Sequence, residues 1–269
     1  MDEGRFREKL VLMRGAGDVA SGVAHRLRQA HFPVVMLELP QPTVIRRTVS
    51  FATAAFTGSI EVEGIRARKT TAQEVEACLA RGEIPLLIDP QGEALEVLRP
   101  EILVDAVMAK KNALGTNLNQ APLVIGLGPG FTAGKDVHGV VETQRGHDLG
   151  RVLWEGKAHE DTGVPGEIAG YSRERLVKAP AEGIWEPVVE IGDVVAAGDL
   201  LARVGRAEAR SEINGVVRGL LYPGLKVHRG MKAGDVDPRG RREYCFTISD
   251  KARAIAGGVL EAILHAGVI

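Results

Sequence analysis

A glycine turn near the start of the chain has the residue types and spacing of a phosphate-binding loop. The turn reads Gly15-x-Gly17-x-x-Ala20 and lies between a short apolar run, residues 10–13, and a helical pattern. In a dinucleotide site the first glycine permits the tight turn and the second lets a pyrophosphate approach the backbone. A small third residue lets helix and strand pack closely. The N–H groups at the helix start then face the phosphate, so the pattern predicts a dinucleotide-binding turn.

An acidic residue follows this turn at the distance that a ribose contact requires. Glu38 ends a second apolar strand and follows Gly17 by roughly the 20 residues typical of an acid that binds the ribose hydroxyls of NAD. Asp18 favours a different interpretation, because it could cap the helix and its charge would repel a pyrophosphate. A different ligand, or a turn that binds nothing, therefore stays open.

A second polar stretch follows the strands expected at 102–107 and 123–127. It contains Lys110, Asn112 and the glycine-rich loop 126–134. Successive N–H groups in such a loop can form an anion nest, and loops at strand carboxyl ends collect ligands in open α/β sheets. We therefore predict one nucleotide site with ten binding residues: Gly15, Gly17, Asp18, Ala20, Glu38, Lys110, Asn112, Gly128, Gly130 and Gly134.

The second stretch lacks the features of two other common sites. Three residues separate Gly130 from Gly134, one fewer than in a Walker-type loop, and Asp136 stands where Ser or Thr would hold magnesium. Asp136 and His138 would share one side of an extended segment, but no third metal ligand can be placed. We therefore expect no metal site. No catalytic residue can be assigned either.

The second half of the chain contains an internal repeat that predicts a small β-domain. Glycines at 183, 192 and 198 recur at 215, 224 and 230, with Val195 and Val227 in matching places. The repeat resembles the lipoyl/biotinyl half-barrel, in which a lysine at the hairpin tip carries the prosthetic group. The tip here, residues 205–211, has no lysine. The amine nucleophile is absent, so we expect the domain to be neither lipoylated nor biotinylated.

These patterns predict an α/β Rossmann-like N-terminal domain, an all-β lipoyl/biotinyl-like barrel-sandwich hybrid domain and a closing C-terminal helix. The expected divisions are 1–160, 161–249 and 250–269. The expected local elements are helices at 42–56, 71–81 and 251–265, a hairpin at 61–69, strands at 84–88, 102–107 and 123–127, and an alternating strand around Cys245.

The bulk composition narrows the class of protein. The 269 residues hold 34 Lys and Arg against 35 Asp and Glu, so the basic excess typical of nucleic-acid-binding proteins is missing. No apolar run reaches the ~20 residues of a membrane span, and the charged N-terminus is unlike a signal peptide. We expect a cytoplasmic protein. The two distant cysteines, Cys78 and Cys245, form no disulfide framework and are interpreted as structural thiols.

Four strings together resemble one family: residues 14–20, 127–131, 142–147 and 232–239. The chain resembles the YqeB-like accessory proteins of selenium-dependent molybdenum hydroxylases, which are similar to the XdhC-type xanthine dehydrogenase accessory proteins. The resemblance spans about residues 9–265. It implies a role in maturing a molybdenum hydroxylase, with the hydroxylase apoenzyme or its maturation factors as partners. The string around Asp235–Arg239 also occurs in the β-domains of aspartoacylase-like zinc deacylases, whose zinc motif is absent here.

Three hypotheses follow. The leading one is an accessory protein that binds a nucleotide-containing ligand, NAD-like or a molybdopterin dinucleotide. The second is an NAD-dependent oxidoreductase, for which Lys110, Lys111 and His147 are candidate acid/base groups without a recognisable catalytic arrangement. The third is a non-catalytic chaperone whose Rossmann region is vestigial.

Overall fold

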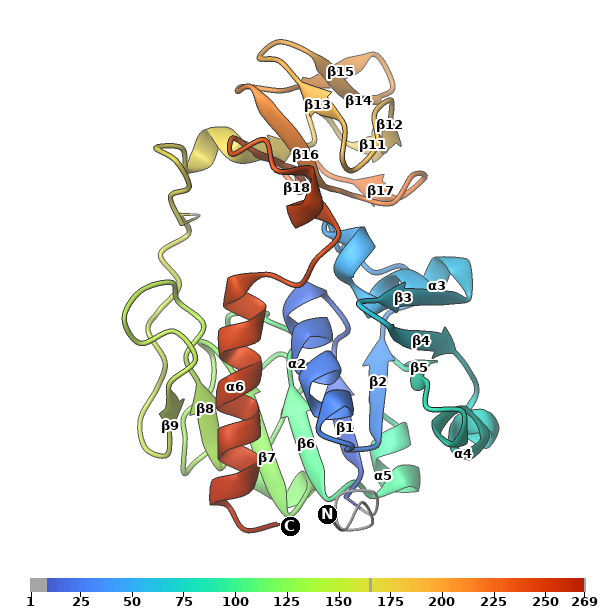
Figure 1. Cartoon of the computed structure of the whole chain (residues 1–269), viewed down its shortest axis with the longest axis vertical. Helices are drawn as coiled ribbons and strands as arrows, with labels where there is room; N and C mark the ends of the chain where they lie inside the picture. The colour runs from blue at the N-terminus through green and yellow to red at the C-terminus, as the bar shows by residue number, and fades with distance from the viewer. Residues whose placement is uncertain (1–8, 165, 269) are drawn as a thin grey trace. The chain divides into compact units, whose positions relative to one another are not determined.

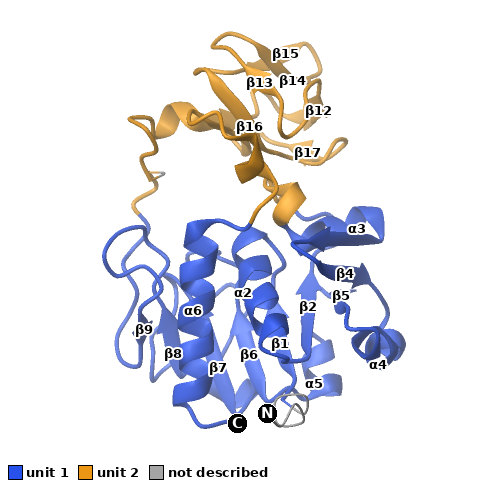
Figure 2. Ribbon diagram, in the orientation of Figure 1, with its two compact units in different colours: residues 1–42, 50–161, 248–269 blue, residues 43–49, 162–247 orange. Residues whose placement is uncertain are grey.

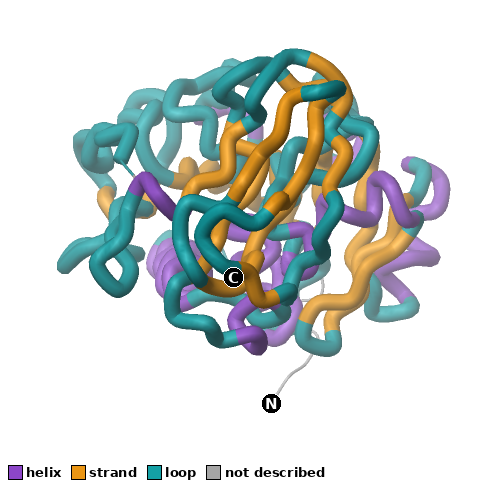
Figure 3. The backbone as a smooth tube through the Cα atoms, turned by 90° about the horizontal axis from the view of Figure 1, so that it is seen from above, coloured by secondary structure: helices purple, strands orange, loops and turns teal. Residues whose placement is uncertain are grey.

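The chain folds into two compact units. The computed structural model describes residues 9–164 and 166–268. The first unit comprises residues 1–42, 50–161 and 248–269, and the second comprises residues 43–49 and 162–247 (Figure 2). The domain boundaries expected from the sequence, after residues 160 and 249, differ from these. Loops and turns make up a large share of the backbone (Figure 3).

The first unit is built on a nine-stranded mixed sheet with the order β3-β4-β5-β2-β1-β6-β7-β8-β9. The strands from β4 to β8 in this order run parallel, and the two edge pairs, β3/β4 and β8/β9, are antiparallel. The strands are β1 Val11–Arg14, β2 Val34–Glu38, β3 Ser59–Val62, β4 Ile65–Lys69, β5 Ile84–Ile88, β6 Ile102–Asp105, β7 Leu123–Leu127, β8 Gly139–Val141 and β9 Val152–Leu153. The central strands are buried and nearly all apolar, as expected of a parallel sheet covered on both faces.

Helices α2 (Asp18–Gln29) and α6 (Asp250–His265) run side by side over one face of this sheet (Figure 1). They approach closely because Gly22 of α2 leaves room for α6: a β-carbon at Gly22 would lie 2.7 Å from that of Ala252. The side chain of Ser249 caps α6 by accepting the N–H of Ala252 at 3.2 Å. The shorter helices are α3 Ala54–Thr57, α4 Val75–Ala80 and α5 Ala94–Leu98.

The second unit contains three small antiparallel sheets, with the orders β10-β18-β16-β13, β11-β17 and β12-β14-β15. Strands from the two copies of the sequence repeat pair with each other, β11 with β17 and β13 with β16. The expected hairpin tip is the turn between β14 and β15. The strands are β10 Leu176–Lys178, β11 Gly183–Ile184, β12 Glu186–Pro187, β13 Val194–Val195, β14 Leu200–Val204, β15 Ala207–Arg210, β16 Gly215–Leu220, β17 Lys226–Val227 and β18 Lys232–Asp237.

The expected fold class is wrong. In place of a Rossmann-like domain, the first unit has a mixed sheet with antiparallel edges at both ends, and the closing helix α6 belongs to this unit. In place of one barrel-sandwich hybrid, the second unit has three separate sheets. Periodicity identifies a segment as a strand, but it does not specify the partner strand or the direction of pairing. The sequence patterns therefore could not predict the antiparallel edge pairs or the number of sheets.

Two local expectations are also wrong, whereas others are confirmed. Residues 42–56 form no continuous helix, and Cys245 ends a 3-10 turn, η6 (Arg242–Cys245), rather than lying in a strand. Long-range hydrogen bonds override the local pattern there, including those from Thr48 Oγ1 to the Cys245 carbonyl and from Arg47 Nε to the Leu220 carbonyl. The hairpin at 61–69 is β3/β4, and Thr71 with Glu74 forms a capping box.

Candidate functional site

The carboxyl ends of the parallel strands gather most of the residues selected from the sequence. Gly15 follows β1, Glu38 ends β2, Gly128 follows β7, and Lys110 and Asn112 lie in the loop after β6. Chain order reverses at β1, because β2 and β5 lie on one side of it and β6 on the other. Ligands of open α/β sheets bind at such a switch point, so this edge is the candidate site.

The glycine turn after β1 is held by contacts within the chain. The Gly15 N–H donates to the Leu37 carbonyl at 2.9 Å, and a β-carbon at Gly15 would lie 3.0 Å from the Ala106 carbonyl oxygen. The Ala16 carbonyl accepts the Ser21 hydroxyl and the Ala52 N–H. Gly15 is therefore required because the turn packs closely against the segment after β6. The sequence pattern had explained this glycine by a bound dinucleotide instead.

Glu38 is tied to the same turn. Its carboxylate accepts the N–H of Ala16 at 2.9 Å and the N–H of Leu39 at 2.8 Å. Burial raises the pKa of Glu38, and these two hydrogen bonds oppose that rise. Gly17 occupies the N-cap position just before α2 and provides no side-chain cap, so Asp18 lies in the first helical turn rather than at the capping position. Ala20 is buried behind the turn.

A buried arginine lies at the centre of this edge. Arg14 is 4% exposed, and its Nη1 donates to the Thr116 hydroxyl and to Gln120 Oε1. The Thr116 hydroxyl in turn donates to the buried carboxylate of Asp105. Among the described residues Arg14 Nε has no hydrogen-bond partner. Burial lowers the pKa of Arg14, and the charges of Asp105 and Asp89 counteract this.

Asn112 and Lys110 serve the loop after β6. The Asn112 side chain donates to the Thr116 carbonyl at 2.7 Å and accepts the Thr116 N–H at 2.8 Å, which closes the loop. Lys110 forms an ion pair with Asp161 at 2.6 Å, and both side chains are partly exposed. Asn112 therefore holds Thr116 against Arg14, and Lys110 lies at the rim.

The glycines of the loop 126–134 fit against the protein. A β-carbon at Gly128 would lie 2.4 Å from the Thr143 hydroxyl, and one at Gly130 would lie 2.5 Å from Cα of Lys111. The Gly134 N–H donates to the Val137 carbonyl in a tight turn. Close packing accounts for Gly128 and Gly130 without a ligand.

Asp136 and His138, the two residues considered as metal ligands, make local hydrogen bonds. Asp136 accepts the N–H of Thr132, and the Val124 N–H donates to His138 Nδ1, so both side chains are used locally. Among the described residues no three His, Cys, Asp or Glu side chains gather as a metal site would require.

A carboxylate–imidazole pair at this edge was missed by the sequence analysis. Glu142, which directly follows β8, is 2% exposed and accepts four hydrogen bonds, two from the N–H groups of Thr143 and Gln144 and two from His159. These bonds lower the pKa of Glu142 although burial raises it. Because an ionised carboxylate only accepts, His159 Nδ1 carries the hydrogen and donates at 2.7 Å. Its Nε2 is then the basic nitrogen of a side chain that is 61% exposed.

No local pattern indicated this pair. Glu142 lay in a string selected for family resemblance, and His159 lies 17 positions further along the chain in a segment without helix or strand. Segment 159–161 carries His159 and Asp161, and Asp161 pairs with Lys110. His159 is thereby brought to the same edge of the sheet as the loop after β6.

No protein-family model matches the chain. It is similar to the curated protein "Uncharacterized protein YqeB" of Escherichia coli (strain K12), with 52% identity over 264 residues, which is 97% of this chain and 49% of the relative. The chain is therefore YqeB-like in sequence and spans about half the length of the curated relative that it matches. Because no family model matches, this similarity does not assign the chain to a named family.

The solved structures that the chain resembles are distant. They include the product-bound ectoine utilization protein EutE (DoeB) from Ruegeria pomeroyi, 13% identical with a TM-score of 0.26 over 85% of each chain. Another is a succinylglutamatedesuccinylase/aspartoacylase from Rhodobacter sphaeroides, 18% identical with a TM-score of 0.27 over 85% of this chain and 84% of that one. A third, TcdA (CsdL), is 11% identical with a TM-score of 0.36 over 98% of this chain and 90% of that one.

The TM-scores of these matches lie below 0.5, so the description of the fold rests on the sheet topology. The activities in their names stay with those proteins. In the part of the chain that the structure describes, none of the helices is both long and apolar enough to span a membrane.

Proposed function

We propose that the carboxyl edge of the nine-stranded sheet binds a nucleotide-containing ligand, and that the chain is an accessory protein in the maturation of a selenium-dependent molybdenum hydroxylase. The pathway rests on the sequence resemblance to YqeB-like accessory proteins. The ligand rests on the geometry after β1 and β2.

The observation that carries the ligand proposal is the link between the start of α2 and Glu38. The first turn of α2 has no side-chain cap from Gly17, and free N–H groups at a helix start favour a phosphate. The Ala16 N–H holds the Glu38 carboxylate beside this turn at 2.9 Å. A carboxylate with two oxygens retains acceptor sites for sugar hydroxyls. Phosphate and ribose sites are thus adjacent, as a nucleotide requires.

The chemistry shared by the two candidate ligands is a ribose joined to a pyrophosphate. NAD(H) and a molybdopterin dinucleotide both present it. Lys110 at the rim supports either ligand by attracting the negative charge. Of the residues selected from the sequence, Gly17 and Glu38 are proposed to contact the ligand, with Lys110 at the rim.

Thermal unfolding of the purified chain tests the ligand. NAD(H), NADP(H), AMP, CTP and GTP are compared, and a nucleotide at about 100 times its Kd should add about 2.7 kcal/mol of stability. Glu38→Gln keeps an acceptor for Ala16 and removes the charge, so it should weaken binding about tenfold or more. Glu96→Gln on the exposed side of α5 is the matched control. Equal binding by both variants, or no shift with any nucleotide, would contradict the proposal.

Coexpression tests the pathway. A selenium-dependent molybdenum hydroxylase is produced with and without the chain, and its molybdenum and selenium contents and its activity are measured. Full loading in the absence of the chain would exclude the accessory role and leave the ligand result untouched.

The Glu142–His159 pair favours a second candidate, an NAD-dependent oxidoreductase. A histidine with its Nδ1 fixed on a buried carboxylate has the geometry of a general acid/base. Lys110 and His147, the candidates from the sequence, lack such a support among the described contacts. Turnover of NAD(H) with small alcohols or hydroxy acids should then be lost in His159→Gln and kept in His147→Gln. Absence of turnover in the unmodified chain excludes this candidate.

A further inference from the structure

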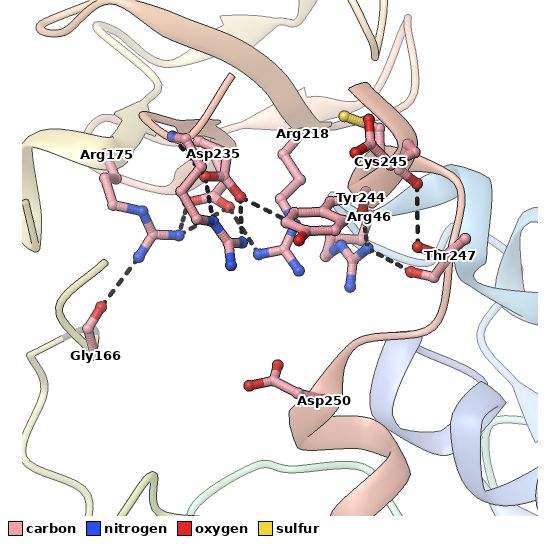
Figure 4. A network of polar contacts seen from close by, with 12 residues as sticks. Arg46, Gly166, Arg175, Arg218, Asp235, Tyr244, Cys245, Thr247 and Asp250 are labelled. Carbon is pink, nitrogen blue, oxygen red and sulfur yellow. Dashed lines mark hydrogen bonds and ion pairs between the residues drawn. The ribbon is translucent and has the colours of Figure 1, made fainter. Parts of the chain in front are cut away.

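Four arginines gather around two aspartates of strand β18 in the second unit (Figure 4). Asp235 and Asp237 lie two apart on β18, so both project from the same face. The pairing of β16 with β18 is interrupted by a bulge between Val217 and Gly219, opposite Val236 and Asp235. Arg218 is the extra residue of this bulge, and its guanidinium lies between the two carboxylates at distances of 3.9 Å and 3.7 Å.

The other three arginines are each anchored by direct hydrogen bonds. Arg175 Nη2 donates to both oxygens of Asp235, and its Nη1 donates to the Gly166 carbonyl. Arg239 donates through Nε and Nη2 to Asp237 at 2.9 Å and 2.6 Å. Arg46 Nη2 donates to the carbonyls of Tyr244 and Thr247. The two aspartates are therefore already engaged by Arg175 and Arg239.

Arg218 has no such anchor. Within the described part of the chain its guanidinium makes no hydrogen bond, and its side chain is only 9% exposed. Burial lowers the pKa of Arg218, and the charge of Arg46 lowers it further, while Asp235 and Asp237 raise it. Its Nε is buried without a hydrogen bond, and the guanidinium reaches Asp235 and Asp237 only as ion pairs at 3.9 Å and 3.7 Å. Its N–H groups therefore still have room for an acceptor at hydrogen-bond distance.

The neighbouring thiol does not supply that acceptor. Cys245 is fully buried, and its Sγ donates to the Val217 carbonyl at 3.6 Å. Burial raises the pKa of Cys245, although the charges of Arg218 and Arg46 oppose this. The thiol is therefore protonated and carries no negative charge. Water could accept hydrogen bonds here, but it would not compensate a charge beside a second arginine.

We propose that Arg218, with Arg175 and Arg46 beside it, binds the oxyanion of a small molecule, either a phosphate or a carboxylate group. Figure 4 shows the guanidinium groups of these three residues pointing in the same direction from three separate segments of the unit. Fixed guanidinium forks match the two or three oxygens of such a group. This site lies in the second unit and does not depend on the nucleotide site proposed above.

Anion titration of the full chain tests the proposal. Unfolding is followed at constant ionic strength with inorganic phosphate, sulfate or malonate replacing chloride, and the Nε resonances of ¹⁵N-labelled arginines are recorded in parallel. We expect phosphate or malonate to stabilise the chain and to move the Arg218 resonance. Preference for phosphate and sulfate identifies a phosphoryl ligand, and preference for malonate identifies a carboxylate.

Two variants with equal charge change make the test specific. Arg218→Gln should weaken anion binding by about tenfold or more. Arg206→Gln, at the exposed turn between β14 and β15, should leave it unchanged. Arg218→Lys keeps the charge without the fork and should bind with intermediate affinity, which also covers the case in which the glutamine variant fails to fold. Equal loss in Arg218→Gln and Arg206→Gln, or an Arg218 resonance that no anion moves, would overturn the proposal.

Discussion

Arg14 in the first unit and Arg218 in the second are both buried arginines whose Nε makes no hydrogen bond among the described residues, but their surroundings differ. Arg14 donates to two neutral oxygens, those of Thr116 and Gln120, and Thr116 passes the contact on to Asp105. Arg218 donates to neither of its carboxylate neighbours, which lie 3.7 Å and 3.9 Å away.

The two units therefore compensate a buried guanidinium charge in different ways. The first unit surrounds Arg14 with its own dipoles and closes the edge with glycines packed against backbone. The second unit pairs its aspartates with other arginines, and the charge of Arg218 remains incompletely compensated. Substitutions at the carboxyl edge of the nine-stranded sheet should therefore change the free energy of unfolding in the absence of ligand. Substitutions in the arginine cluster should change the free energy of unfolding by an amount that depends on added anions.

The largest effect is expected from Asp235→Asn. Removing this carboxylate leaves Arg175 and Arg218 without a shared negative partner, and breaking a buried ion pair costs about 3–5 kcal/mol. Urea unfolding measures the loss, with Glu212→Gln, exposed in the same unit, as the control. Phosphate should restore part of the stability. If anions do not change the loss of stability, Arg218 behaves like Arg14, and the contrast between the two units does not hold.

Gly130→Ala should follow in magnitude. Its β-carbon would meet the Lys111 backbone at 2.5 Å, at a φ of +108°. Strain and overpacking together predict a loss on the order of 3 kcal/mol or more. Gly134→Ala has a positive φ but meets only the Trp154 carbonyl at 3.9 Å, so it should cost about 1 kcal/mol. If both variants fold normally and only nucleotide binding is lost, the loop serves the ligand rather than the packing.

Glu142→Gln should destabilise the chain by about 2 kcal/mol at neutral pH, because four donors then face an uncharged amide. The folded state lowers the pKa of Glu142 from its ordinary 4.5. Its contribution is therefore present above pH 4.5 and is lost as the pH falls through the lowered value. Stability measured against pH should fall less steeply on the acid side in the variant. Glu160→Gln, an exposed neighbour, should leave the curve unchanged.

A smaller effect than that of Glu142→Gln is expected from Thr116→Val, which keeps the shape and removes the hydroxyl between Arg14 and Asp105. Loss of these two buried hydrogen bonds predicts about 1–2 kcal/mol. Thr116→Ser retains the hydroxyl and should be close to the parent in chemical denaturation. A cost as large as that of Asp235→Asn would show that Arg14 also depends on a single partner.

Several features were determined by the sequence alone, because they depend on neighbouring residues. Thr71 and Glu74 form the capping box within one helical turn, and Ser249 caps α6. The strands at 84–88 and 123–127 coincide with β5 and β7, because each is a short apolar run bounded by charged residues or by Pro and Gly. The missing lysine at the tip of the β14/β15 turn is likewise a property of composition.

Other features were decided only by the tertiary structure, because their partners lie far apart in the chain. Arg14 meets Thr116 across 102 positions, and Arg175 meets Asp235 across 60. A buried charge needs a hydrogen-bond or ion-pair partner, and local periodicity does not show which distant residue provides it. For the same reason the sequence patterns yielded the strands but not the mixed sheet, and the glycine loops but not the backbone against which they pack.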